Sequence, residues 1–329
     1  MADFRSHGPR EWANLGIVVL LAVIVPVIAT SQGQAYYLTL TTRIMVFALA
    51  AAGLNLAMGF GGMVSLGHAM YLGIGAYAVG ILSEHGIAQA YAHFGIALLV
   101  GALVAVPVGV VCLRTSGMAF IMITLAFAQM AYFVAGSLER YGGEDGLPVA
   151  ARSQIAGLDM GDGLTFYVVV FVILMSVLWL MQRLIHSQFG MALQGARINE
   201  RRMAAMGFPV RRYLLIAYVL SAEICVIAGV LLADLTKFVS PSYMQWSMSG
   251  ELIVMVVLGG MATLLGPVAG AASMVALEEI LANLQLDWIP GLDRLLADHW
   301  LALVGLFVIL VTLRMHRGLL GSLRSSGQP

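Results

Sequence analysis

Long apolar runs, separated by short polar segments, dominate this chain and predict a bundle of membrane-spanning helices. A helix needs about 20 apolar residues to cross a bilayer, because the hydrocarbon layer is about 30 Å thick and each residue rises about 1.5 Å. We predict spans at 14–30, 36–59, 64–82, 94–113, 118–137, 165–185, 213–235, 250–264, 267–284 and 299–314. The pattern therefore indicates an all-α integral membrane protein with about 8–10 transmembrane helices.

Two parts of this pattern allow alternatives. The apolar region 250–284 is too long for one span and short for two, and a break that contains Gly260 and Pro267 favours two. The first apolar run follows Arg5 and Arg10 and precedes small residues, so it fits either a first span or a cleaved signal peptide. The remaining topology is the same in both cases.

Composition agrees with the apolar pattern and excludes several classes of protein. Hydrophobic residues make up 60% of the chain and charged residues only 10%, and the mean hydropathy is +0.93. Soluble domains carry about 25% charged residues, so a soluble fold is excluded. The formal net charge is zero, which argues against nucleic acid as a partner.

Single residue types narrow the chemistry further. Lys237 is the only lysine and follows Asp-Leu-Thr, so the chain cannot contain the GxxxxGK[ST] loop that binds nucleotide phosphates. If ATP drives this protein, another subunit hydrolyses it. Cys112 and Cys225 lie in or at the ends of apolar runs and are interpreted as packing residues rather than a disulfide or metal site. We predict no catalytic residue, no metal site and no cofactor bound by this chain.

The distribution of basic residues predicts the orientation. With the N-terminus inside, the cytoplasmic segments hold 12 of the 17 basic residues, and the long outer loop 138–164 is acidic. By the positive-inside rule, both termini are cytoplasmic. We therefore predict a cytoplasmic tail at 1–13, a transmembrane domain at 14–314 and a second cytoplasmic tail at 315–329. The outer loop is interpreted either as a docking site for a soluble protein or as a plain connector.

The most polar stretch of the chain is the cytoplasmic segment 186–212, which is basic and favours helix. It contains Arg197, Arg201, Arg202, Arg211 and Arg212, and Arg183 lies just before it. One interpretation is a surface that docks an ATPase. The alternative is a topology signal that also contacts anionic lipid.

Polar and small residues in two spans are candidates for a substrate path. The third span is rich in glycine, and Ser65, Gly67 and His68 lie where a helix break is expected. Interrupted helices expose backbone N–H groups that suit a carboxylate. Thr124 and Gln129 occur in the fifth span. The alternative for all five is packing and hydrogen bonding between helices inside the bundle.

Charged residues inside spans are costly, so each one is a candidate for function. Arg43 lies in the second span and Glu223 in the seventh. Glu223 is either protonated or paired with Arg43 across the bundle. Glu251, Glu278 and Glu279 are closer to span ends and are expected to reach solvent.

The cytoplasmic segment resembles the coupling loop of ABC importer permeases, where an alanine pair and a later glycine form a short helix–turn–helix. It reads GMALQGARINERRMAAMGFPVRRY at 190–213. More widely, residues 36–285 resemble the M-type permease of the branched-chain amino acid ABC transporter family. The other supporting segments are GLNLAMGFGGMVSLGHAMYLGIGAY at 53–77, ITLAFAQM at 123–130, YGGEDGL at 141–147 and FVSPSYMQWSMSGELIVMVVLGGMATLLGPVAGA at 238–271. The chain departs from the family pattern at Arg201, Arg202, Met203 and Glu223.

The resemblance implies a bacterial inner-membrane importer with several subunits. A second homologous permease completes the translocation path, two P-loop ATPase subunits use ATP and Mg, and an extracytoplasmic binding protein delivers the substrate. It also implies residues that couple to the ATPase: Gly190, Arg197, Arg201, Ala204, Ala205 and Gly207. The expected substrates are branched-chain or related amino acids, with urea, short amides or aromatic carboxylates as the alternative.

Two other classes of function remain as alternatives. A proton-coupled secondary transporter would use Glu223 and should show an internal repeat and paired midplane charges, neither of which is evident. An intramembrane enzyme would need a catalytic group such as Ser65 with His68. That pair lacks an orienting acid nearby in the sequence.

Overall fold

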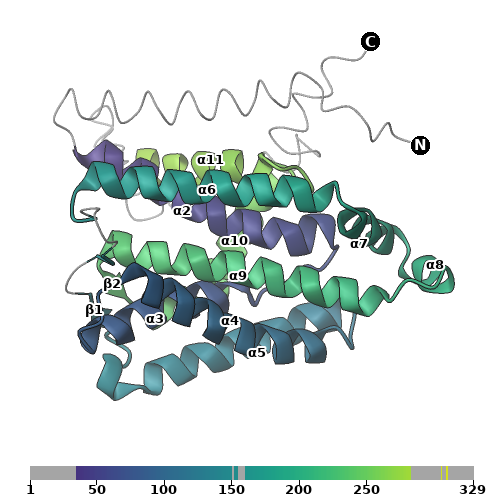
Figure 1. Ribbon diagram of the computed structural model, residues 1–329, viewed down its shortest axis with the longest axis horizontal. Helices are drawn as coiled ribbons and strands as arrows, with labels where there is room; N and C mark the ends of the chain where they lie inside the picture. The colour runs from purple at the N-terminus through teal and green to yellow at the C-terminus, as the bar shows by residue number, and fades with distance from the viewer. Residues whose placement is uncertain (1–34, 150–151, 155–159, 283–304, 306–308, 310–329) are drawn as a thin grey trace, which may run out of the picture.

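The computed structural model describes residues 35–149, 152–154 and 160–282, together with Gly305 and Ile309. These residues form a helical bundle (Figure 1), which confirms the predicted all-α membrane class. The helices are α2 (Ala35–Asn55), α3 (His68–Glu84), α4 (Ala90–Cys112), α5 (Met118–Ser137), α6 (Gly163–Ile185), α7 (Gln188–Ile198), α8 (Glu200–Ala205), α9 (Val210–Thr236), α10 (Trp246–Gly259) and α11 (Gly266–Ala282). The short elements are the π-helix η1 (Leu56–Phe60), the 3-10 helices η2 (Glu139–Tyr141) and η3 (Pro241–Met244), and the strands β1 (Leu147–Pro148) and β2 (Phe238–Val239).

Five helical stretches in the described part are long and apolar enough to cross a membrane. They are Tyr36–Phe60, which joins α2 to η1, and the helices α4, α5, α6 and α9. On α4 and α5, large apolar side chains point outward, with Leu103 70% and Phe133 68% exposed. An outward apolar face is expected where lipid replaces water as the solvent.

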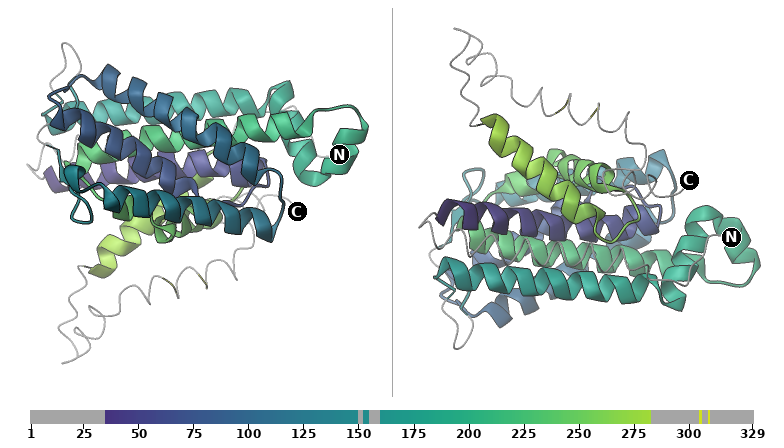
Figure 2. Two further views of the ribbon diagram at one scale, coloured as in Figure 1. Left: turned by 90° about the horizontal axis from the view of Figure 1, so that it is seen from below. Right: turned by 90° about the horizontal axis from the view of Figure 1, so that it is seen from above.

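Helix α9 forms the centre of the bundle and packs against α2, α3 and α4. In Figure 1, α6 and α11 lie on one side of α2 and α9, and α3, α4 and α5 lie on the other. Figure 2 shows that these helices run along one long axis, with α11 inclined to it. Glycines permit the close approach of α3 to α9, because an added Cβ on Gly229 would lie 2.8 Å from the Leu72 carbonyl carbon.

The two ends of the bundle differ. At one end, α7 and α8 project beyond the other helices (Figure 1). At the other end, Leu147 of β1 pairs with Val239 of β2 in a short antiparallel ribbon. This second end carries the predicted outer loop 138–164. The predicted orientation therefore places α7 and α8, at the opposite end, in the cytoplasm.

A break in the predicted span 64–82 shortens the helix that forms there. Helix α2 continues as the π-helix η1, and residues 61–67 are not helical before α3 begins at His68. Gly62 has a φ of 73°, a conformation that glycine adopts without strain. The helix break expected near Ser65 therefore exists, and it lies just before α3.

The region 250–284 contains two helices, as its central break favoured. Helix α10 ends at Gly259 and α11 begins at Gly266, and the two pack against each other. The predicted spans 14–30 and 299–314 and the tails 1–13 and 315–329 lie outside the described residues, apart from Gly305 and Ile309. The total number of spans and the domain boundaries therefore stay predictions.

Candidate functional site

The segment 186–212 folds as two short helices joined at one residue. The Ser187 side chain caps α7 by accepting a hydrogen bond from the Gly190 N–H at 3.4 Å, and Asn199 caps α8 by accepting one from the Arg202 N–H at 2.9 Å. Ser and Asn are preferred at this position because their oxygens satisfy N–H groups of the first turn. The sequence therefore carries its own signals for a helix–turn–helix.

Helix α8 ends in a Schellman motif at Gly207. The Phe208 N–H donates to the Met203 carbonyl at 3.2 Å and the Gly207 N–H to the Ala204 carbonyl at 3.0 Å. Gly207 has a φ of 86°, in the left-handed region that this motif requires. No atom lies within 4 Å of the position of an added Cβ, so backbone conformation rather than crowding requires glycine here.

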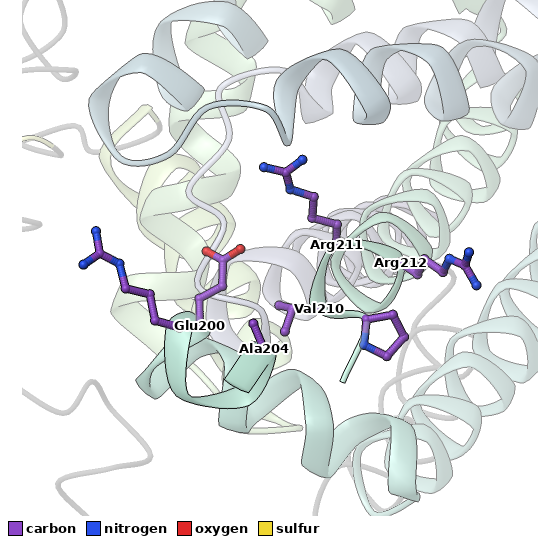
Figure 3. A pocket seen from close by; sticks show the side chains of 7 residues that line it. Glu200, Ala204, Val210, Arg211 and Arg212 are labelled. Carbon is purple, nitrogen blue, oxygen red and sulfur yellow. The ribbon is translucent and has the colours of Figure 1, made fainter. Parts of the chain in front are cut away.

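Between α8 and the start of α9 lies a groove of about 590 Å³ with a basic rim (Figure 3). Its lining residues are Glu200, Arg201, Ala204, Pro209, Val210, Arg211 and Arg212. All except Val210 are exposed. Figure 3 shows the side chains of Arg211 and Arg212 pointing away from each other, so they reach both sides of α9. The groove is suited to an acidic or polar segment of a partner.

The arginines of this segment do not all serve the same surface. The guanidinium of Arg197 donates a hydrogen bond to the Gly59 carbonyl of η1, in the membrane bundle. By contrast, Arg201 lines the groove, and Arg202 is exposed on the same helix, α8. Of the other residues expected to couple to an ATPase, Gly190 is buried, whereas Ala204 and Ala205 are exposed.

Four of the five predicted path residues lie together inside the bundle, where Gly67 is buried against Thr124. Ser65, His68 and Thr124 are fully buried. The hydroxyl of Thr124 accepts a hydrogen bond from the Leu66 N–H at 3.2 Å, and the Ser65 hydroxyl accepts one from the Gly67 N–H at 3.1 Å. These N–H groups lie at the start of α3, where no helical carbonyl is available to them.

Two further serines complete this cluster, and the sequence pattern did not indicate either of them. Ser221 of α9 bonds His68 Nε2 at 2.8 Å, and Ser249 of α10 accepts from the Ala69 N–H at 3.0 Å. Nδ1 of His68 finds no hydrogen-bond partner in the described bundle. Ser221 lies two residues before Glu223 in an apolar run, and Ser249 lies between Ser247 and Glu251 in a polar stretch. Neither pattern indicates a bond to the start of α3. Gln129 lies farther along α5 and is half-buried.

Arg43 and Glu223 do not meet. Both carboxylate oxygens of Glu223 are buried without a hydrogen-bond partner among the described residues. They lie 3.1 and 3.3 Å from where a Cβ of Gly101 on α4 would be. Arg43 is exposed on α2, above the Phe47 ring at 5.7 Å, and interacts electrostatically with Glu251 and Glu278. The alternative in which Arg43 pairs with Glu223 is therefore wrong for this conformation.

The described parts of the outer loop are hydrogen-bonded to helices of the bundle. The Ser153 hydroxyl donates to Asp234 of α9 at 2.8 Å and bonds His93 of α4 at 2.6 Å. At the end of the loop, Asp162 caps α6, and hydrogen bonds from Thr165 hold the pKa of this carboxyl below its usual value. These contacts give the loop a connecting role, whether or not it also docks another protein.

The polar groups of the described part contain no metal cluster: no three His, Cys, Asp or Glu side chains converge there. The described polar groups supply hydrogen bonds and charge. The cytoplasmic end offers a basic groove, and the interior offers a buried polar cluster beside a helix break.

Comparison with known proteins identifies relatives of this arrangement. Residues 36–315 match the family described as "Branched-chain amino acid transport system / permease component". The high-affinity branched-chain amino acid transport system permease protein LivM of Escherichia coli K12 is 26% identical over 290 residues, which cover 81% of this chain and 67% of the relative. LivM of Salmonella typhimurium LT2 is 25% identical over 292 residues, covering 80% and 68%. No solved structure matches the chain.

Proposed function

The chain belongs to the branched-chain amino acid transport permease family, and from this premise we propose that it forms half of the translocation path of an ABC importer. It is a multi-pass membrane protein with the apolar helices this role requires. In the proposal, a second homologous permease supplies the other half, and an extracytoplasmic binding protein delivers branched-chain or related amino acids. Both termini are cytoplasmic.

The observation that carries this proposal is the projecting helix pair α7–α8 with its basic groove. A short rigid element at the end of a membrane bundle can transmit the movement of a docked subunit. We assign the groove, which Ala204 helps to line, and the neighbouring Ala205 to contact with one of two P-loop ATPase subunits. Those subunits use ATP and Mg, and this chain contributes no catalytic residue and binds no cofactor.

Purification tests the assembly directly. The tagged chain would be extracted in mild detergent after gentle crosslinking, and the proteins that accompany it identified by mass spectrometry. We expect a second permease and a P-loop ATPase. Recovery of this chain alone would contradict the proposal and favour a secondary transporter.

The substrate is tested by reconstitution. The complex would be placed in proteoliposomes with its binding protein, and ATP-driven uptake of radiolabelled leucine measured against urea and benzoate. Uptake of leucine is the expected outcome. Uptake of urea or benzoate without leucine would favour the amide or aromatic carboxylate alternative within the same family.

One observation keeps a second class in view. The carboxylate of Glu223 is buried on the apolar helix α9 and has no hydrogen-bond partner within the part of the chain that the structure describes. Intramembrane carboxylates commonly serve proton relays, so a proton-coupled transporter built on Glu223 is the competing function. Such a transporter would work without an ATPase and would depend on the proton gradient.

A further inference from the structure

Arg197 differs from the other arginines of the cytoplasmic segment because it joins that segment to the membrane bundle. Its guanidinium donates to the Gly59 carbonyl, and its aliphatic stem lies across Gly62. A Cβ on Gly62 would lie 2.9 Å from Cγ of Arg197. The Arg197 side chain, which belongs to the projecting helix α7, thus contacts the last turn of the long helix formed by α2 and η1.

The physical basis of this contact is the C-terminal end of a helix. The run from α2 through η1 ends at Phe60, and carbonyls in a last turn have no helical N–H to accept from. A cation is also favoured at this end of a helix, where partial negative charge gathers. Arg197 therefore supplies both a donor and a charge to a group that needs them.

The π-helix that receives Arg197 is bound in turn to the break between α10 and α11. Asn55, fully buried at the start of η1, accepts a hydrogen bond from the Ala262 N–H at 3.0 Å and donates one to the Thr263 carbonyl at 2.9 Å. Gly59 lies against the same turn, since its added Cβ would be 2.7 Å from the Ala262 nitrogen. A continuous set of contacts thus runs from α7 to the α10–α11 turn.

We propose that Arg197 is a positioning residue, which passes movement of α7–α8 through the π-helix to the turn between α10 and α11. This inference rests on the proposed function, because it needs an ATPase that moves α7–α8. Single turns of π-helix are rare and occur often at functional sites. Here η1 lies between α7 and the α10–α11 turn, and the Arg197 guanidinium joins it to the projecting helices by a hydrogen bond to the Gly59 carbonyl.

The proposal predicts a specific defect when the donor is removed. Arg197→Met keeps the aliphatic stem on Gly62 and loses only the hydrogen bond and the charge. The ATPase still docks on the groove, so ATP hydrolysis continues, but less of it produces transport. We expect the leucine transported per ATP hydrolysed to fall at least about fivefold, a coupling energy of about 1 kcal/mol.

The ratio of leucine transported to ATP hydrolysed would be measured in the reconstituted complex with its own partners, with radiolabelled leucine as the probe. Arg197→Lys keeps a donor and a charge and should stay within about twofold of the parent protein. Arg114→Met is the matched control, because Arg114 is exposed near the same end of the bundle and does not line the groove. An unchanged ratio in Arg197→Met would overturn the proposal, and so would a parallel loss of hydrolysis and transport.

A second readout does not depend on the substrate. Met261, in the α10–α11 turn, is 45% exposed, and both natural cysteines are buried. In a Met261→Cys background, we expect ATP with vanadate to change the rate of maleimide labelling, and Arg197→Met to abolish that change. Persistence of the change would contradict the link. Absence of leucine uptake by the parent protein would instead count against the proposed substrate. The labelling test does not need a substrate, so it would still decide whether Arg197 connects α7 to the α10–α11 turn.

If the Arg197→Met protein fails to assemble, Asn55→Asp tests the contact between η1 and the α10–α11 turn instead. It keeps the shape and the acceptor for Ala262 and removes the donor to Thr263. The same fall in leucine per ATP supports the link. Normal coupling in this variant would overturn it.

Discussion

Ser221 satisfies two buried groups with one hydroxyl. It donates to the Gly53 carbonyl at 2.6 Å, so its oxygen is left to accept from His68 Nε2 at 2.8 Å. The single hydroxyl proton therefore assigns the proton of His68 to Nε2. This explains why His68, singled out as a possible path residue, is held as part of the bundle interior in this conformation.

Replacing Ser221 by alanine should destabilise the bundle. The change leaves the His68 N–H and the Gly53 carbonyl without partners inside the membrane, at a cost of about 1 kcal/mol. We expect Tm in detergent to fall by about 2–4 °C. Ser176→Ala on the exposed face of α6 is the control, because that hydroxyl bonds only a carbonyl of its own helix. Equal Tm values for the two variants would contradict this account.

Glu223 distinguishes the two classes of transporter. Glutamine keeps the size of the side chain and removes its titration, so an ATP-driven permease should retain leucine uptake in Glu223→Gln. Uptake would be measured in proteoliposomes with and without a protonophore. Complete loss in a fully assembled complex, or sensitivity of the parent protein to the protonophore, would support proton coupling instead.

At the scale of elements, the helix–turn–helix owes its shape to caps at both ends. Ser187 and Asn199 start its helices, and Gly207 ends it in a left-handed conformation. These are local effects. Residue pattern indicated only that the segment favours helix, and the resemblance to a coupling loop implied the turn; the caps at Ser187 and Asn199 were not predicted. The contact of Arg197 with Gly59 joins positions far apart in the chain, and no local pattern indicated it.

Gly207 offers a test of this element. An ordinary L-residue costs about 1–2 kcal/mol in the left-handed region, while asparagine tolerates it. We expect Gly207→Asn to keep most leucine uptake, and Gly207→Trp to insert normally but lose transport because its bulk displaces α8 from the ATPase. Membrane insertion would be checked by fractionation. Normal uptake by a correctly inserted Gly207→Trp would remove α8 from the coupling role.

For the whole molecule, one end is basic and the other carries the connected outer loop. Several arginines at the basic end are exposed, among them Arg201 and Arg202 on α8 and Arg211 and Arg212 at the start of α9. Surface charges of this kind steer and orient a partner more than they stabilise the fold. The basic end is therefore where another subunit is expected to be recognised.

Reversing charge at the groove should weaken that recognition. In the double variant Arg201→Glu with Arg211→Glu, we expect the ATPase retained during purification to fall at least about tenfold, with Tm of the permease unchanged. Retention would be measured at low and high salt. An ATPase retained equally at both, in parent and variant, would show that the groove is not its docking site.

The sequence by itself determined the class of fold, most helix boundaries and the helical form of the segment 186–212. Each of these depends on local properties: the length of apolar runs, capping residues and glycine conformation. Tertiary structure alone decided which polar side chains meet. Ser221 reaches His68, Asn55 reaches the α10–α11 turn, and Arg43 lies apart from Glu223. Helix packing determines such pairs, since it depends on which faces approach each other and at what depth.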